Sequence, residues 1–217
     1  MKYISLGLHC SVSIALQKLN LREYCYPFDW LWCPSKTSYE ILDVLFKEGI
    51  DKAIEYMTTD YNYYNHTGKN EFVPSSEPTV WYMNKRTGLG ITHYEVDDEF
   101  KQKLRRRFER LLRDINSDEL TFIYADACNP RDNYSLGFEY YGTDATDYLI
   151  KIYDLITRKN ENIKILYFCW DERKKENNKI TYISFPHQDH CLDVVEIIRL
   201  FLTSPKKETT ESQVEVY

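Results

Sequence analysis

The sequence contains no run of about eighteen apolar residues, so we expect no membrane-spanning helix and no membrane partner. The residues after Met1 lack the apolar core of a secretory leader, and we therefore expect a cytoplasmic protein. An excess of basic residues is also missing, because the net charge is −6. We expect no nucleic-acid partner, since nucleic-acid binders are usually basic. Internal repeats are absent as well.

The six cysteines follow no zinc-ribbon or zinc-finger spacing. Without a leader, a disulfide framework is not expected, so most cysteines should be thiols. The residues with the best metal-binding chemistry crowd into one short loop: His187, Asp189, His190 and Cys191. No second pair of ligands accompanies them at a suitable spacing. We therefore expect no metal and no cofactor.

A large apolar core is present in the composition. Apolar residues make up 43% of the chain and aromatic residues 15%, which favours a folded protein over a disordered one. Residues 1–204 are predicted to form one domain, and the charged residues 205–217 a flexible tail. Within the domain, the polar, Tyr- and Asn-rich residues 58–80 indicate a long loop or a small insertion.

Strand and helix patterns alternate along much of the chain. Apolar runs predict strands at 2–7, 120–125, 163–170 and 181–185, and a turn at 84–88 predicts a hairpin of short strands at 79–83 and 89–94. Helices are predicted at 38–47 and from Asp97, Asp144 and Asp193. The helix from Asp97 has an apolar face, and its arginines, Arg107 included, are assigned to the remaining surface. This alternation predicts an α/β fold: a single-domain three-layer sandwich with a mostly parallel or mixed central sheet and helices on both faces.

The first strand leads into the most suggestive residue of the chain. After the strand come a turn at Gly7 and then Cys10, at the first position of an amphipathic helix. A helix N-terminus favours an anion, so Cys10 is placed to be a thiolate and a nucleophile. The alternative is that a small residue is simply needed where the helix begins.

A thiol nucleophile needs a base, and His93 is our preferred candidate. It ends a predicted strand and precedes a helix, at the kind of sheet edge where ligands gather in α/β folds. His9 is adjacent to Cys10 in sequence, and neighbouring side chains at a helix start tend to diverge. His9 is therefore expected to be a poor base and a better oxyanion donor, together with Ser5 and the Cys10 N–H.

The base would be oriented by a carboxylate, and two candidates stay open. Asp126 follows a predicted strand and would lie at the same sheet edge as His93. Asp29 lies between Phe28 and Trp30 in a rigid, turn-like segment, where Trp30 could contact a substrate. Spacing alone does not choose between the two carboxylates.

These residues resemble the signature of the DUF1796 family, uncharacterised proteins of bacteria and large DNA viruses for which a papain-like cysteine peptidase activity is predicted. The matching blocks are Ile4 to Gly7, Cys10, Leu19 to Arg22, Tyr26 to Trp30, and Gly90 to Tyr94. The resemblance covers about residues 2–125. It implies a papain-like α+β fold as the alternative architecture and, for a viral member, the host cytoplasm.

The resemblance also bears on the site. It implies Cys10 as nucleophile and His93 as base, and it raises Asp29 as a site residue. One departure is that Leu8 and His9 stand where the family often has a Ser-Asn pair before its cysteine. His9 would then replace an Asn amide as oxyanion donor.

We therefore expect a cysteine hydrolase or peptidase that cleaves or transfers a peptide, isopeptide or other amide or acyl bond of a peptide or protein substrate. The alternative is a non-catalytic protein-interaction module of a virus or bacterium with an inert Cys/His pair. Its contacts would be tyrosines in predicted loops: Tyr61, Tyr63, Tyr64, Tyr140 and Tyr141. The sequence leaves the oligomeric state open.

Overall fold

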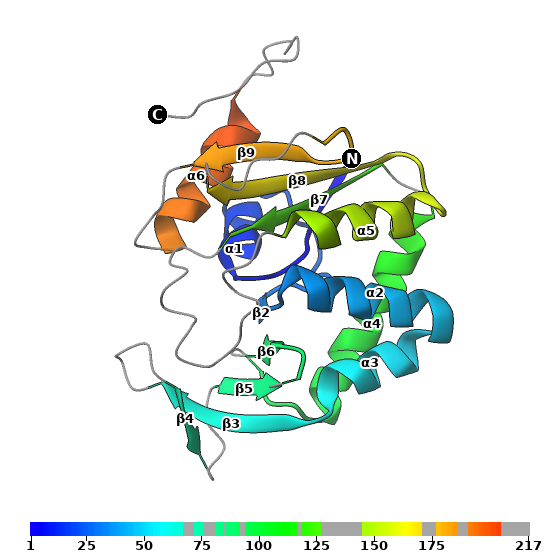
Figure 1. The fold of residues 1–217 in the computed structure, drawn as a ribbon, viewed down its shortest axis with the longest axis vertical. Coiled ribbons are helices and arrows are strands. Elements are labelled where there is room, and N and C mark those ends of the chain that lie inside the picture. The colour runs from blue at the N-terminus through cyan, green and yellow to red at the C-terminus, as the bar shows by residue number, and fades with distance from the viewer. Residues whose placement is uncertain are drawn as a thin grey trace.

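A four-stranded parallel sheet occupies one half of the molecule (Figure 1). The computed structural model describes residues 1–66, 72–75, 81–84, 86–91, 94–116, 119–126, 145–170, 177–185 and 191–204. The sheet has the order β1-β7-β8-β9. Its strands are β1 (Lys2–Ser5), β7 (Leu120–Ala125), β8 (Ile163–Trp170) and β9 (Thr181–Phe185). All its pairs are parallel, and β7 is buried at every position because both faces are covered.

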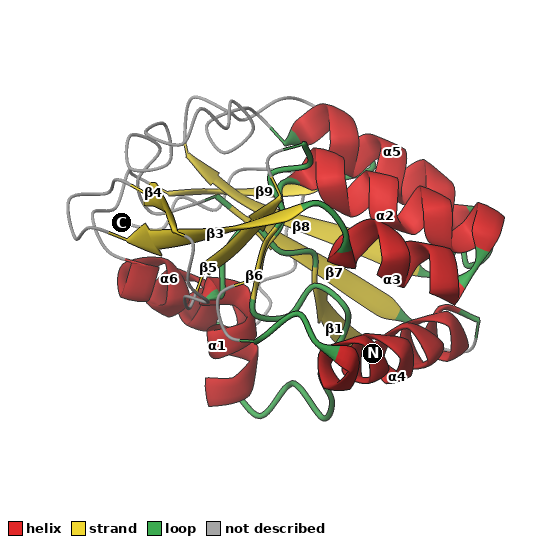
Figure 2. Ribbon diagram, turned by 90° about the horizontal axis from the view of Figure 1, so that it is seen from below, coloured by secondary structure: helices red, strands yellow, loops and turns green. Residues whose placement is uncertain are grey.

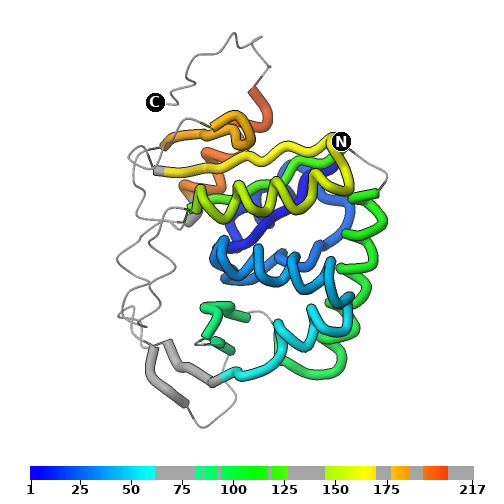
Figure 3. The backbone as a smooth tube through the Cα atoms, turned by 45° about the vertical axis from the view of Figure 1, so that its right-hand side comes forward, coloured from blue at the N-terminus to red at the C-terminus, as the bar shows by residue number. Residues whose placement is uncertain are grey.

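Helices cover the two faces of this sheet, which gives the predicted three-layer α/β sandwich. Alternate residues of β7 enter different cores: Ile123 packs with α1 (Ser11–Lys18) and α6 (Cys191–Thr203), and Phe122 packs on the other side. That side is covered by α2 (Ser35–Glu48), α4 (Asp98–Ile115) and α5 (Thr146–Thr157). Figure 2 shows α1 and α6 on one side of the strands, and α2 and α5 on the other. Helix α3 (Ile50–Thr58) packs between α2 and α4 (Figure 3).

A second sheet of five antiparallel strands lies below the first (Figure 1). Its order is β2-β6-β5-β3-β4. Its strands are β2 (Leu31–Trp32), β3 (Tyr61–His66), β4 (Phe72–Ser75), β5 (Trp81–Asn84) and β6 (Gly90–Ile91). Of the two alternatives predicted for residues 58–80, the long loop was wrong, because this stretch supplies β3 and β4, and the small insertion stays a prediction. The tyrosines of this stretch suit a strand despite their polar neighbours.

Helix ends largely follow the signals in the sequence. Gly49 ends α2 with a φ of 93°, and the Asp97 carboxylate accepts a 2.7 Å hydrogen bond from the Phe100 N–H at the start of α4. Two starts differ from the prediction. Helix α2 begins at Ser35, directly after Pro34, and α6 begins at Cys191, so that Asp193 lies in its first turn instead of capping it.

The two sheets share one hydrophobic core. Leu6, which follows β1, belongs to the same buried cluster as Leu31 of β2 and Ile91 of β6. The Ser38 hydroxyl of α2 donates a 2.7 Å hydrogen bond to the Leu6 carbonyl. The end of β1 is therefore held near both α2 and β2. Residues 205–217, predicted to be a tail, lie outside the described residues. No helix in the described part is long and apolar enough to cross a membrane.

Candidate functional site

The turn between β1 and α1 is held against β2. Gly7 has a φ of 95°, and a Cβ at this position would lie 2.6 Å from the Cβ of Cys33. Leu8 follows with a φ of 67°, and its N–H donates a 2.8 Å hydrogen bond to the Cys33 carbonyl. A non-glycine residue in this conformation is strained and persists only where its surroundings fix it. This contact sets where the chain enters α1.

Cys10 lies at that entry, as the N-cap residue of α1, and is half-buried. Its thiol makes no capping hydrogen bond. Instead, Cys10 Sγ lies 3.5 Å from His9 Nδ1 and 4.0 Å from His9 Nε2. The expectation that these neighbouring side chains diverge was wrong. The left-handed conformation of Leu8 precedes them and sets the direction in which they leave the backbone.

Ser11 and Trp32 hold the His9 ring. The Ser11 N–H donates to His9 Nδ1 at 3.3 Å, and the Ser11 hydroxyl lies 2.9 Å from the same atom. The ring also packs against Trp32 of β2 at a centroid distance of 5.4 Å. Because a backbone N–H can only donate, Nδ1 is an acceptor, and we assign the proton of the neutral ring to Nε2. That N–H can donate to a developing negative charge.

Ser5 and Trp30 lie in different surroundings. Ser5 is fully buried, and its hydroxyl oxygen accepts a 3.2 Å hydrogen bond from the Gly7 N–H, which stabilises the turn. Trp30 is partly buried and has a φ of 67°. The guanidinium of Arg22 lies 5.3 Å from its ring centroid. Ser5 therefore lies at the turn before Cys10, and Trp30 ends the Tyr26–Trp30 segment that packs beside α1.

Asp29 is fully buried beside α1. Its carboxylate accepts a 2.7 Å hydrogen bond from the Ser13 hydroxyl and a 2.8 Å hydrogen bond from the Tyr26 N–H. Arg22 Nη1 lies 3.6 Å from Asp29 Oδ2. Burial raises the pKa of Asp29, while the two hydrogen bonds and the charges of Arg22 and Arg107 oppose that rise. The hydrogen bonds of Asp29 thus join the Tyr26–Trp30 segment to Ser13 of α1.

Asp126 lies at the carboxyl end of β7 and is also buried. Its Oδ1 accepts a 2.9 Å hydrogen bond from the Tyr167 hydroxyl, and its N–H donates to the Phe168 carbonyl. Strand β1, which leads to Cys10, pairs with β7, and the Leu6 N–H continues the pairing to Ile123. Asp126 and the Cys10 turn therefore extend from the carboxyl ends of adjacent parallel strands, where α/β proteins bind ligands.

His93 lies outside the described residues, but the residues that flank it in sequence are placed. Ile91 pairs with Leu31 of β2. Tyr94 stacks on Phe100 of α4 at 5.0 Å and accepts a 2.8 Å hydrogen bond from Arg107. The residues flanking the Thr92-His93 pair are thus fixed to β2 and to α4. The predicted contact between Cys10 and His93 stays a prediction.

Cys33 and Cys169 differ from Cys10 in their surroundings, whereas Cys25 is half-buried like Cys10. Cys33 is fully buried with its Sγ 3.1 Å from the Ser38 Oγ, and burial raises its pKa to about 12. Cys169 is buried in β8. These surroundings keep both thiols protonated or inaccessible. Within the described ranges, neither a disulfide nor a group of three metal-ligating side chains occurs. The loop residues His187, Asp189 and His190 lie outside those ranges.

Sequence reasoning missed Arg107 and Ser13. Arg107 was assigned to the surface but is only 7% exposed, so that assignment was wrong. The signal was available, because Arg107 lies three residues after Leu104 and four before Leu111, on the apolar face of α4. Ser13 gave no such signal: its bond to Asp29 depends on how the Tyr26–Trp30 segment folds back onto α1.

Comparison with known proteins identifies a family for this chain. The family model described as "Putative papain-like cysteine peptidase (DUF1796)" matches residues 1–164. An uncharacterised protein of Acanthamoeba polyphaga mimivirus, R408, is 28% identical over 144 residues. The match covers 59% of this chain and 62% of R408, so the chain spans less than two thirds of that relative. No solved structure is significantly similar.

Proposed function

Since the chain belongs to the family described as "Putative papain-like cysteine peptidase (DUF1796)", we propose that it cleaves or transfers an amide or acyl bond with Cys10 as nucleophile. The observation that carries this proposal is the position of Cys10 Sγ, at the start of α1 and 3.5 Å from an imidazole nitrogen. A helix N-terminus favours the thiolate, and the His9 Nε2–H, 4.0 Å from the same sulfur, can donate to it. Peptides and proteins, isopeptides included, are the proposed substrates.

In the proposed reaction, the Cys10 thiolate attacks the carbonyl carbon and forms a C–S bond. The carbonyl oxygen becomes an oxyanion, which the Cys10 N–H and the His9 Nε2–H stabilise. When the intermediate collapses, the leaving amine takes a proton from His93 and a thioester remains. Water then attacks the thioester and gives its proton to His93. The C–S bond breaks, and the thiolate is restored with release of the acid.

We assign the base to His93 and the oxyanion role to His9. His9 Nδ1 already accepts from the Ser11 N–H and contacts the Ser11 hydroxyl, so its lone pair is engaged and its remaining N–H is a donor. His93 follows β6, and β6 pairs with the strand that carries Trp32, the ring neighbour of His9. The family resemblance supports the same assignment.

We propose Asp126 as the carboxylate that orients the base. It lies at the end of β7, beside the strand that leads to Cys10. Asp29 is the less suitable carboxylate, because Ser13 and the Tyr26 N–H each donate to one of its oxygens and Arg22 lies beside it. A cytoplasmic location suits this chemistry, since a reducing compartment keeps a nucleophilic thiol reduced.

The first prediction concerns the reactivity of Cys10. Iodoacetamide labelling is followed by mass spectrometry at each cysteine between pH 5 and 9, in the wild type, His9→Ala and His93→Ala. We expect fast labelling of Cys10 well below the ordinary thiol pKa of about 8.5, slowed by His93→Ala. Buried Cys33, with its raised pKa, is the internal control and should stay unlabelled in the folded protein.

Other outcomes would change the proposal. If His9→Ala slows the labelling and His93→Ala does not, His9 is the base and the assignment of the two histidines is reversed. If Cys10 reacts only near pH 8.5 and is indifferent to both substitutions, the thiol is not activated and the proposed hydrolase activity is wrong. Capture of binding partners would then be the next experiment.

A further inference from the structure

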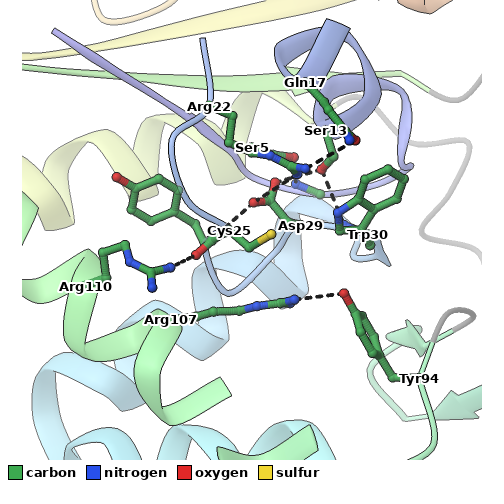
Figure 4. A network of polar contacts seen from close by, with 12 residues as sticks. Ser5, Ser13, Gln17, Arg22, Cys25, Asp29, Trp30, Tyr94, Arg107 and Arg110 are labelled. Atoms are coloured by element: carbon green, nitrogen blue, oxygen red, sulfur yellow. Dashed lines mark hydrogen bonds and ion pairs between the residues drawn. The ribbon is translucent and has the colours of Figure 1, made fainter. Parts of the chain in front are cut away.

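A group of buried polar residues lies on α1, on the segment that follows it and on α4, and it includes a contact to the residue that follows His93. Figure 4 shows its members: Ser13 of α1 donates to Asp29, Arg22 lies beside the same carboxylate, and Arg107 of α4 reaches toward the Tyr94 hydroxyl. Ser13 lies one helical turn after Cys10. The charge of Arg107 also acts on Asp29.

This arrangement is costly for the fold. Arg107 is 7% exposed, and the side chain of Arg22 is 9% exposed. Within the described ranges, Nη1 of each arginine is buried and has no hydrogen-bond partner. Arg22 lies 3.6 Å from the Asp29 carboxylate, whereas the hydrogen bond of Arg107 goes to the uncharged hydroxyl of Tyr94. A buried donor without a partner costs about 1–3 kcal/mol, and an apolar side chain of similar volume is often equally stable at such a site.

The contacts of Arg107 indicate what it does. Its Nη2 donates to the Tyr94 hydroxyl at 2.8 Å, while the Tyr94 ring stacks on Phe100. Tyr94 is covalently attached to His93. Arg107 therefore fixes one end of the connection between β6 and α4, and the pairing of Ile91 with Leu31 fixes the other. Catalytic groups must be held within a fraction of an ångström of their working positions, so such anchors affect rate.

We infer that Arg107 is a positioning residue of the proposed site: through its hydrogen bond to the Tyr94 hydroxyl it anchors to α4 the residue that follows His93. This role rests on the proposed function. It explains why an arginine occupies a position on the apolar face of α4 where a methionine would fill the space.

The test compares Arg107→Met and Tyr94→Phe with the wild type and His93→Ala, using the pH dependence of Cys10 alkylation and the melting temperature. Tyr94→Phe keeps the ring and removes only the oxygen that accepts from Arg107. Arg106→Met is the matched control, because Arg106 is the exposed neighbour on the same helix. We expect alkylation at pH 7 to slow about 10- to 100-fold in Arg107→Met and Tyr94→Phe and not in the control.

The double variant should be no slower than the slower single variant, because both changes remove one contact. Arg107→Met should melt within a few degrees of the wild type. If alkylation of Cys10 in the wild type is fast and depends on His93, but Arg107→Met leaves the pH dependence of alkylation unchanged, the positioning role is wrong and the proposed function stands. A large drop in melting temperature with new labelling of Cys33 would mean that Arg107 is structural. Slow, His93-independent labelling in the wild type would overturn the proposed function and this role with it.

Discussion

At the scale of single residues, the site depends on a glycine that no other residue can replace without strain. Gly7 combines a positive φ with a close approach to Cys33. Gly49 has a similar φ of 93°, but a Cβ at that position would meet nothing within 4 Å. An alanine at either position would pay for the left-handed backbone, but only an alanine at Gly7 would also clash with a neighbour. Comparing the two substitutions therefore distinguishes backbone strain from steric clash.

We predict that Gly7→Ala lowers the free energy of unfolding by about 1–3 kcal/mol more than Gly49→Ala does. Both variants force alanine into a left-handed conformation, but only the first drives a methyl group into Cys33. Urea denaturation of both variants measures the difference. Equal losses of unfolding free energy would show that Cys33, which follows β2, moves away from the turn at little cost.

The contact between His9 and Cys10 was not predictable from sequence, and the reason is local. Whether two consecutive side chains meet depends on the dihedral angles before them, and Leu8 has a φ of 67° that is rare for leucine. The buried position of Arg107 was predictable, because its spacing to Leu104 and Leu111 puts it on the apolar face of α4.

At the scale of elements, the strands buried on both faces were the easiest to predict. The predicted strands at 120–125 and 163–170 coincide with β7 and β8, whose apolar runs are typical of strands covered on both faces. The strand predicted at 181–185 coincides with β9, an edge strand in which only alternate residues are buried. Of the antiparallel sheet, the hairpin predicted from strands at 79–83 and 89–94 corresponds to β5 and β6, which pair antiparallel. Strand β2 was missed because two residues are too few to show a pattern, and β3 was missed because it is rich in Tyr and Asn.

The C-terminal end of α4 is joined to β1 and to the Tyr26 segment by one carboxylate. Asp114 accepts a 2.7 Å hydrogen bond from the Tyr26 hydroxyl and pairs with Lys2 and Arg113, each at 3.0 Å. Burial alone would raise the pKa of Asp114, but these partners outweigh burial and hold the pKa below its usual value. The native state therefore favours the ionised form.

This shift predicts how stability depends on pH. A lowered native pKa stabilises the fold fully above the unfolded value of about 3.9, and the contribution is lost as the pH falls toward the native pKa. We expect Asp114→Asn to lower the free energy of unfolding at pH 7 by about 2–4 kcal/mol, with a smaller difference from the wild type below pH 4. Asp98→Asn, which alters an exposed ion pair, is the control and should change little.

At the scale of the whole molecule, the two sheets share one hydrophobic cluster, so we expect them to unfold together. Leu31 of β2 is fully buried in the cluster that also contains Leu6, which follows β1. Leu31→Ala should lower the melting temperature of the entire protein, with a loss of about 2–5 kcal/mol. Far-ultraviolet circular dichroism and tryptophan fluorescence should give one coincident transition. Two separate transitions would mean that the antiparallel sheet unfolds independently.

The pairing of β1 also determines when the site can exist. Lys2 pairs with Leu120 and Ser5 with Ile123, so the strand that presents Cys10 has its sheet neighbour in the middle of the chain. Loop closure of that length must precede the pairing, and contacts so distant in sequence form slowly. During synthesis the N-terminal segment therefore emerges long before its partner strand. A nascent chain carries the thiol without the scaffold that orients it, and reactivity at Cys10 should begin only after β7 has left the ribosome.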